Sequence, residues 1–290
     1  MRDGANLAIR NFIEEVRAGS VDPSDRKFFD IYANEAAFGF AVIRGDIESL
    51  ARGARVLEVG AGILLLSGFL AASGFQVHAI EPVAAGFSHS RKLQKAVLSH
   101  YEKIGLKVTL VESEIENFAE TECFDYAFSI NVFEHIRDIE MGLSNAYRSL
   151  RPRGALRIYC PNYHFPYEPH FNIPTLFSKR FTELVFMSSI LKSKRVIEAK
   201  ETWDGLNWIN VTRVRSFFRK RFAATPVFNS RATYLIASRI MSDPQFAARR
   251  SSWMSHCLRQ MRRTGLLHLF KFIPVAIAPV MDFKIERGAA

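Results

Sequence analysis

Hydrophobic and polar residues follow a regular pattern through the middle of the chain. Short apolar runs that end at Gly, Pro or polar residues indicate buried strands. These runs lie at 54–62, 75–82, 106–113, 126–132 and 155–162. Between them, apolar residues at three- and four-residue spacing predict helices at 63–73, about 86–103 and 138–150, and RPRG at 151–154 predicts a turn. Strands that alternate with helices predict a doubly wound α/β fold, with helices on both faces of a parallel sheet.

The pattern changes on both sides of this middle region. The expected flanking elements are helices at 5–18 and 34–51, a Pro-, His- and aromatic-rich loop at 163–174, an apolar helix at 175–192, a polar stretch to 205, a helix at 212–228 feeding a sixth strand, mostly helical basic sequence at 231–273, and a last strand at 279–287. The sheet is therefore expected to have seven strands, mostly parallel, with a helical insertion after the fifth. Four regions follow: an N-terminal helical cap (1–53), an α/β core (54–162), a loop with a helical insertion (163–211), and C-terminal helices with closing strands (212–290).

The apolar run LLHLFKFIPVAIAPVM at 266–281 is a candidate membrane segment. A transmembrane helix needs about 20 apolar residues. This run is shorter and contains His268, Lys271, Pro274 and Pro279. We interpret it as a core helix followed by a buried strand, with an amphipathic surface anchor as the alternative.

Composition is that of a globular protein, with 48% hydrophobic and 23% charged residues. The three cysteines, Cys123, Cys160 and Cys257, show no metal-ligand spacing, and so few cysteines favour a reducing compartment. Glu14 and Glu15 interrupt the N-terminal stretch where a secretion signal needs an apolar run. We therefore expect a cytoplasmic protein.

Positive charge gathers late in the chain. The net charge is +10 and the pI is about 9.7, and the basic residues concentrate at 213–221 and 249–263. Such a balance favours an anionic partner, which could be nucleic acid, a phosphorylated substrate or a lipid surface; a solvated helix face is the simpler alternative.

Two features at the ends of the first two strands point to a nucleotide-type ligand. In Glu58-Val-Gly-Ala-Gly62, Gly60 and Gly62 allow a sharp turn and a close backbone approach, and the next helix would present its N–H groups there. Glu81 ends the second strand about twenty residues later, where a carboxylate can accept hydrogen bonds from both ribose hydroxyls of an adenosine.

The order and spacing of four motifs resemble class I methyltransferases, and most closely the small-molecule group that includes the ubiquinone-biosynthesis O-methyltransferases. These motifs are Glu58-Val-Gly-Ala-Gly62, Glu81-Pro82, Phe124-Asp-Tyr-Ala-Phe-Ser-Ile-Asn-Val-Phe-Glu-His-Ile-Arg-Asp138 and Leu150-Arg-Pro-Arg-Gly154. The resemblance covers about residues 54–162 and implies a Rossmann-like methyltransferase fold that uses S-adenosylmethionine (SAM). The 54–162 region would then bind SAM, and the loop after it would bind the acceptor.

The resemblance also implies roles for individual residues. The loop Gly60-Ala61-Gly62 would hold the methionine end of SAM, with Glu58 near its amino group. The roles assigned further along the chain are ribose binding by Glu81, adenine binding by Glu112 and the Ser113 backbone, and a backbone contact from Asn131 to the methionine portion. One departure is Leu64, where the family usually has a small residue.

A Rossmann dehydrogenase is the rival interpretation of the glycine loop. Its fingerprint would place a third glycine at position 65, where this chain has Leu65. The dehydrogenase is therefore disfavoured.

Candidate catalytic residues follow the fourth and fifth strands. His135 lies beyond the fourth strand, at the edge where open α/β sheets bind ligands, and could take a proton from an acceptor hydroxyl; packing of the next helix is the alternative role. The loop after the fifth strand offers an acceptor pocket through Tyr163, His164, Tyr167 and His170. We predict no metal, because His164 and His170 lack convincing further ligands.

We therefore expect a methyltransferase that acts on a small or lipid-linked acceptor, with a hydroxyl favoured and nitrogen or carbon open. A nucleic-acid methyltransferase or binder is the first alternative, but the fourth strand ends Ser129-Ile-Asn-Val without the Asn/Asp-Pro-Pro-Tyr pattern of base-amine methylation. A SAM-binding protein without catalysis is the second. The basic C-terminal region could also contact the inner face of a membrane.

Overall fold

The computed structural model describes residues 2–82, 88–176, 178–193, 196, 199–248 and 252–289. The chain forms two compact units. The first unit comprises Met1–Ile130, Leu143–Arg157 and Glu286–Ala290, and the second comprises Asn131–Gly142 and Ile158–Ile285. Parts of the predicted elements at 86–87, 177, 194–195, 197–198 and 249–251 lie outside the described residues.

Within the described residues, seven strands form one sheet in the order β3-β2-β1-β4-β5-β7-β6. The strands are β1 (Arg55–Val59), β2 (Gln76–Ile80), β3 (Thr109–Val111), β4 (Phe124–Ile130), β5 (Leu150–Pro161), β6 (Val227–Phe228) and β7 (Val280–Glu286). β1 pairs in parallel with β2 and β4, and β2 with β3, whereas β6 and β7 are antiparallel. The predicted mostly parallel, seven-stranded fold is confirmed.

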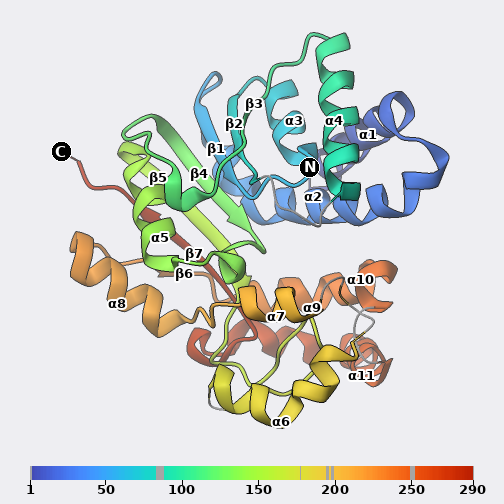
Figure 1. Cartoon of the computed structure of the whole chain (residues 1–290), viewed down its shortest axis with the longest axis vertical. Coiled ribbons are helices and arrows are strands. Elements are labelled where there is room, and N and C mark those ends of the chain that lie inside the picture. The colour runs from blue at the N-terminus through green and yellow to red at the C-terminus, as the bar shows by residue number, and fades with distance from the viewer. Residues whose placement is uncertain are drawn as a thin grey trace. The chain divides into compact units, whose positions relative to one another are not determined.

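The helices of the first unit bury their apolar faces against one another and the sheet. They are α1 (Arg2–Ser20), α2 (Arg26–Ile47), α3 (Leu65–Ala72), α4 (Ser88–Lys103) and most of α5 (Ile139–Arg148). Figure 1 shows α1, α2 and α4 lying together, and α1 contacts α2, α3 and α4. In α1, Ile9, Ile13 and Val16 recur at helical spacing and are buried.

The helices of the second unit follow β5. They are α6 (Lys179–Leu191), α7 (Ala199–Gly205), α8 (Val211–Phe222), α9 (Ala232–Ser242), α10 (Pro244–Ala248) and α11 (Ser252–Arg263), followed by the 3-10 helices η4 (Leu266–Phe272) and η5 (Val275–Ile277). α9, α10, α11 and η4 share a small core of Ala237, Ile240, Phe246, Leu258 and Leu267. Ser178 and Asn210 cap α6 and α8 by accepting a backbone N–H.

The turn predicted at RPRG (151–154) is wrong. These residues belong to β5, although Arg153 has a left-handed backbone (φ +66°). The N–H of Arg153 donates to the carbonyl of Arg287 (2.9 Å), and the N–H of Arg287 donates to the carbonyl of Gly154 (2.8 Å). Pairing with Arg287, more than 130 residues away, therefore makes this segment a strand. Local sequence propensity cannot predict such a distant partner.

Several element boundaries also differ from the sequence prediction. The helix predicted at 34–51 begins at Arg26, the strand at 106–113 shortens to Thr109–Val111, and the polar stretch before 205 contains α7. The apolar run 266–281 forms η4, η5 and the start of β7 instead of one long helix. Among the described residues, no helix is long and apolar enough to cross a membrane.

Candidate active site

The glycine loop follows β1 with an unusual backbone. Gly60 (φ +79°), Gly62 (φ +55°) and Leu64 (φ +70°) all adopt left-handed conformations, which glycine accepts without strain. The N–H groups of Gly60 and Ala61 donate to the carbonyl of Ile80 (2.8 and 3.2 Å), which ties the loop to the end of β2. Leu64 stands where a small residue was expected; its side chain is buried and its carbonyl accepts from the Tyr101 hydroxyl (3.1 Å).

Glu81 lies against this loop, as the sequence suggested. It follows β2, and its Oε2 accepts from the N–H of Gly62 at 2.8 Å. The Nε2 of Gln94 donates to the carbonyl of the same glycine at 2.8 Å. Burial raises the pKa of Glu81, while the Gly62 N–H opposes the rise. The fold therefore holds a carboxylate against the glycine loop, with the ring of Tyr32 beside Gly62.

Glu58 is a buried carboxyl one residue before the end of β1. It accepts a hydrogen bond from the Ser67 hydroxyl of α3. Burial raises its pKa to about 8, the Ser67 hydrogen bond lowers it and the charge of Glu81 adds to the rise. A cationic group brought to this carboxyl would favour its ionised form, so Glu58 fits an ammonium ligand.

Glu112 and Ser113 follow β3, the neighbour of β2 in the sheet. The backbone N–H of Glu81 donates to the carbonyl of Val111 at 3.1 Å, which brings this segment beside Glu81. The Glu112 side chain is half exposed and lies 3.8 Å from Arg91. Asn131, in the second unit, has a left-handed backbone (φ +56°) and donates its N–H to the carbonyl of Tyr159 at 2.7 Å.

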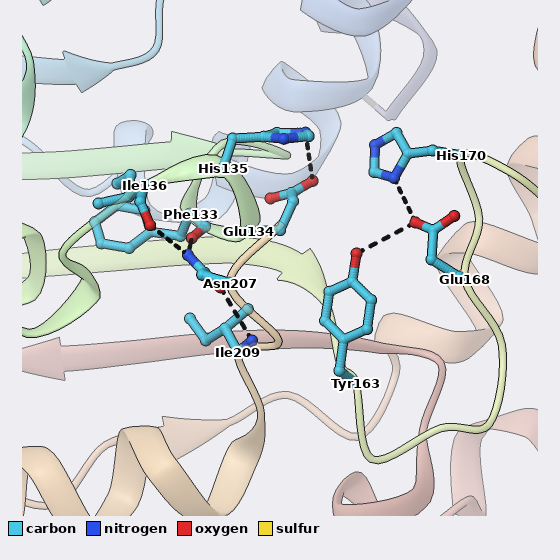
Figure 2. Close-up of polar contacts among 9 residues, drawn as sticks. All are labelled: Phe133, Glu134, His135, Ile136, Tyr163, Glu168, His170, Asn207 and Ile209. Atoms are coloured by element: carbon cyan, nitrogen blue, oxygen red, sulfur yellow. Dashed lines mark hydrogen bonds and ion pairs between the residues drawn. The ribbon is translucent and has the colours of Figure 1, made fainter. Parts of the chain in front are cut away.

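His135 and Glu134 lie on a short 3-10 turn after β4, η3 (Phe133–His135). Asn207 holds this turn: its Nδ2 donates to the carbonyls of Phe133 (2.5 Å) and Ile136 (2.7 Å), and its backbone N–H donates to the carbonyl of Glu134 (2.9 Å). Figure 2 shows the Asn207 side chain between these carbonyls and the N–H of Ile209. Asn207 is not predicted from the sequence, because no local pattern links it to a turn about seventy residues earlier.

The loop after β5 folds around Glu168. This fully buried carboxylate accepts from the hydroxyl of Tyr163 (3.2 Å) and the N–H of Phe171 (2.7 Å), and it lies 2.6 Å from Nδ1 of His170. Burial alone would raise the pKa of Glu168, but the hydrogen bond and charge of His170 and the backbone N–H groups lower it overall. The structure therefore gathers Tyr163 and His170 around the carboxylate of the same loop.

For the other two predicted acceptor residues, the structure shows different contacts. His164 is exposed, and its backbone N–H donates to Asn162 at 3.3 Å. The hydroxyl of Tyr167 bonds to the side chain of Asn172.

His135 and His170 lie next to each other, with ring centroids 5.0 Å apart in an edge-on arrangement. Nε2 of His135 is 3.9 Å from Oε1 of Glu134. One donor atom from each of Glu134, His135 and His170 lies within 4.8 Å of the others, so these three are the described residues that could hold a metal ion. Burial, followed by the charge of His170, lowers the pKa of His135; water reaching its side chain, which is 39% exposed, offsets part of that desolvation.

Comparison with known proteins agrees with this geometry. Residues 57–156 match the family described as a methyltransferase domain. An uncharacterized protein of Mycobacterium tuberculosis is 36% identical over 285 residues, covering 97% of this chain and 96% of that protein. The mouse mitochondrial ubiquinone biosynthesis O-methyltransferase is 34% identical over 112 residues, covering 38% of this chain and 29% of that protein.

Residues 57–156 form a methyltransferase domain, and the protein is a SAM-dependent methyltransferase. A solved phosphoethanolamine N-methyltransferase 2 of Haemonchus contortus, in complex with SAM, shares the fold of this methyltransferase at a TM-score of 0.52 and 19% identity, over 86% of this chain and 52% of that one. SAM is the cofactor of the methyltransferase. The residues present fit it, because the left-handed glycine loop, the Glu81 carboxylate and the buried Glu58 carboxyl offer a close backbone approach and two acidic partners.

Replacing Glu58 with Gln in this methyltransferase is expected to reduce the pH dependence of its stability. Because burial raises the Glu58 pKa from 4.5 to about 8, the folded state keeps a proton that the unfolded state loses, and the free energy of unfolding falls as the pH rises through that window. Glu58→Gln removes this contribution. Denaturant titrations of the wild-type protein and of Glu58→Gln at pH 5 and pH 8 measure this contribution. If the free energy of unfolding fell equally in the two proteins between these pH values, the raised pKa of Glu58 would be contradicted.

Replacing Asn207 with Ala is expected to lower the free energy of unfolding by about 2–3 kcal/mol, because two backbone carbonyls lose their donor. Asn145 offers a matched control, since its Nδ2 donates to the carbonyls of Ile115 (3.0 Å) and Glu116 (2.8 Å) in the first unit. Both variants should lose stability in denaturant titrations. Only Asn207→Ala should shift the NMR resonances of the His135 and His170 rings, and unchanged resonances would show that Asn207 does not hold the turn.

Proposed function

We propose that this methyltransferase methylates a hydroxyl oxygen of a small or lipid-linked acceptor. The observation that carries the proposal is the cluster on the loop after β5, where Tyr163 and His170 converge on the buried Glu168 close to the His135 ring. Small-molecule sites are typically lined by aromatic side chains, with a few polar groups that fix the orientation of the ligand. The partial relatives from mouse and Rickettsia conorii, named ubiquinone biosynthesis O-methyltransferases, support an oxygen acceptor.

SAM, when bound, supplies an electrophilic methyl group. For this cofactor, the Gly60-Ala61-Gly62 loop would hold the methionine end and Glu58 would pair with the amino group. Glu81 would accept hydrogen bonds from the ribose hydroxyls. Further along the chain, Glu112 and the Ser113 backbone would contact the adenine, and the Asn131 backbone would contact the methionine portion. These assignments rest on the resemblance together with the positions described above.

The acceptor would lie on the loop after β5, against Tyr163, His164, Tyr167 and His170. His135 would activate the hydroxyl, since its side chain is 39% exposed and follows β4 directly. Methyl transfer is an in-line displacement, so most of the protein's work is alignment. A neutral imidazole can accept a hydrogen bond from a hydroxyl, which the lowered pKa of His135 favours.

The acceptor class is tested by measuring S-adenosylhomocysteine formation with a panel of phenolic, amine and carboxylate compounds, one of them carrying a prenyl tail. We expect turnover with phenolic hydroxyls and loss of turnover in His135→Gln. Turnover of amines alone, or of RNA or DNA, would overturn the proposal. SAM binding without any product would make the protein a binder of the cofactor. Mass spectrometry of co-purified small molecules identifies the acceptor directly.

We further propose that the protein works in the cytoplasm and contacts the inner face of a membrane. Large apolar side chains are exposed in the second unit, on α6 at Phe181, Leu184, Val185 and Leu191, and after α11 at Leu266, Leu269, Phe272 and Ile277. Basic residues accompany both groups in the sequence: Lys179, Arg180, Lys192, Arg262, Arg263 and Lys271. Exposed apolar groups beside cations suit an anionic lipid surface.

Co-sedimentation with vesicles of anionic lipid tests this contact. The protein should pellet at low salt and less so as salt rises, because screening weakens its attraction to the surface. Leu269→Asp should reduce pelleting. Leu7→Asp is the matched control, since both leucines are 58% exposed and Leu7 lies on α1. Equal effects of the two variants, or no pelleting at low salt, would contradict membrane contact.

A further inference from the structure

The strongest unassigned feature of the molecule is the group of nitrogen and oxygen donors on the second unit. We infer that Glu134, His135 and His170 form a binding site for a divalent transition-metal ion, with Zn²⁺ as the best fit. The donor atoms lie within 4.8 Å of one another. Two imidazoles with one carboxylate form a ligand set that Zn²⁺ and related borderline ions prefer over Mg²⁺ or Ca²⁺. The sequence predicted no metal because His164 and His170 lacked further ligands, whereas the fold brings His170 to Glu134 and His135.

Backbone geometry explains how neighbouring residues share one site. Adjacent side chains on an α-helix point in different directions. Glu134 and His135 instead lie on the short 3-10 turn η3, and their facing atoms are 3.9 Å apart. The Asn207 side chain fixes the carbonyls of Phe133 and Ile136 on either side of them. The turn therefore presents both donors in the same direction.

Glu168 orients the third ligand. It contacts Nδ1 of His170 at 2.6 Å and is held by the N–H of Phe171 and the hydroxyl of Tyr163. With Nδ1 engaged, Nε2 is the ring atom for the metal, and Figure 2 shows it on the side of the ring that faces His135 and Glu134. Metal-ligating histidines usually donate their other ring N–H to a carboxylate in this way, which fixes the tautomer and strengthens the ligand.

The fit requires only a small movement. Ligands about 2.0–2.2 Å from one Zn²⁺ ion lie roughly 3.5 Å apart in a tetrahedral site, so the donors would close by about 1 Å. Glu134 is 1% exposed and His170 is held by Glu168, whereas the side chain of His135 is 39% exposed and has room to adjust. Three protein ligands leave a position for water. If the proposed function holds, the acceptor's hydroxyl oxygen would take that position, and His135 would act on the hydroxyl through the ion and not by accepting its hydrogen bond.

Metal binding itself is the test. The full chain, stripped with EDTA, is titrated with Zn²⁺ by calorimetry and with Co²⁺, whose visible spectrum reports coordination by nitrogen and oxygen. We expect one tight site per chain that His135→Ala and His170→Ala abolish and that Glu168→Gln weakens about 10- to 100-fold. His256→Ala is the matched control, because His256 is an exposed histidine of the same unit, and it should leave the site unchanged.

Two outcomes overturn the site: no binding tighter than that left in the double variant His135→Ala/His170→Ala, or a Co²⁺ spectrum that these substitutions do not change. Circular dichroism checks that each variant is folded; if His170→Ala unfolds, His170→Asn and Glu168→Gln decide the question by the same spectrum. Zinc binding without methylation of any hydroxyl would keep the site and overturn the proposed function. Methylation of a hydroxyl by a protein that binds no metal would keep the proposed function and overturn the metal site.

Discussion

Replacing Gly60 with Val is expected to abolish SAM binding while leaving most of the protein folded. The backbone of Gly60 is left-handed (φ +79°) and its N–H is tied to the end of β2. A β-branched residue is strained by roughly 1–3 kcal/mol in this conformation. Its side chain would also fill the space through which a ligand approaches the backbone. Calorimetry with SAM and S-adenosylhomocysteine measures the loss.

Gly53→Val separates the loss of ligand from the loss of stability. Gly53 has the same φ of +79° just before β1, and open space surrounds the position that a Cβ would take. Both variants should therefore carry the strain of a side chain on a left-handed backbone. Gly53→Val should still bind SAM. If Gly60→Val unfolds completely while Gly53→Val does not, the loop's main role is structural, and if Gly60→Val binds SAM normally, the loop does not carry the cofactor.

Replacing Glu81 with Ala is expected to weaken SAM binding by about 1.5–3 kcal/mol, which is the usual loss when charged hydrogen bonds are removed. This corresponds to about 10- to 150-fold in the dissociation constant. The reason is twofold. The carboxylate would accept hydrogen bonds from both ribose hydroxyls. It also positions the glycine loop, because it accepts a hydrogen bond from the N–H of Gly62. Calorimetric titration with SAM gives the change directly.

Glu114→Ala is the control for Glu81→Ala. Glu114 is an exposed glutamate of the same unit that begins the 3-10 helix η2 (Ile115–Asn117). Its removal changes the net charge equally and should leave SAM affinity within twofold or so. NAD should bind to neither protein. Unchanged SAM affinity in Glu81→Ala would remove this carboxylate from the cofactor site.

The glycine loop and Glu81 could be located from the sequence because their signals are local. A glycine that must adopt a left-handed backbone, a strand of consecutive apolar residues and a carboxylate at the next strand's end are each visible within a few residues. The contacts of Gly62 with Glu81 and of Gly60 with Ile80 followed, since parallel neighbouring strands end at the same edge. The cofactor roles of Glu58, the Gly60–Gly62 loop, Glu81, Glu112, Ser113 and Asn131 all stay predictions.

The catalytic side was less predictable for a physical reason. Its parts come from segments about 35 to 75 residues apart, on η3, the loop after β5 and Asn207. Hydrogen bonds between such segments leave no periodicity in the sequence. Glu168 illustrates the difficulty: its place in a Pro-rich loop does not predict burial, yet it is fully buried and contacts Tyr163, His170 and Phe171.

By itself the sequence determined the α/β class, the strands β1 to β4 and the glycine loop after β1, because hydrophobic periodicity and glycine conformation act over short range. Tertiary structure alone decided that RPRG joins β5, since its partner Arg287 lies at the far end of the chain. It also decided that Glu134, His135 and His170 meet. Those outcomes depend on which distant segments become neighbours, and chain connectivity, packing and buried hydrogen bonds settle that only when the whole chain folds.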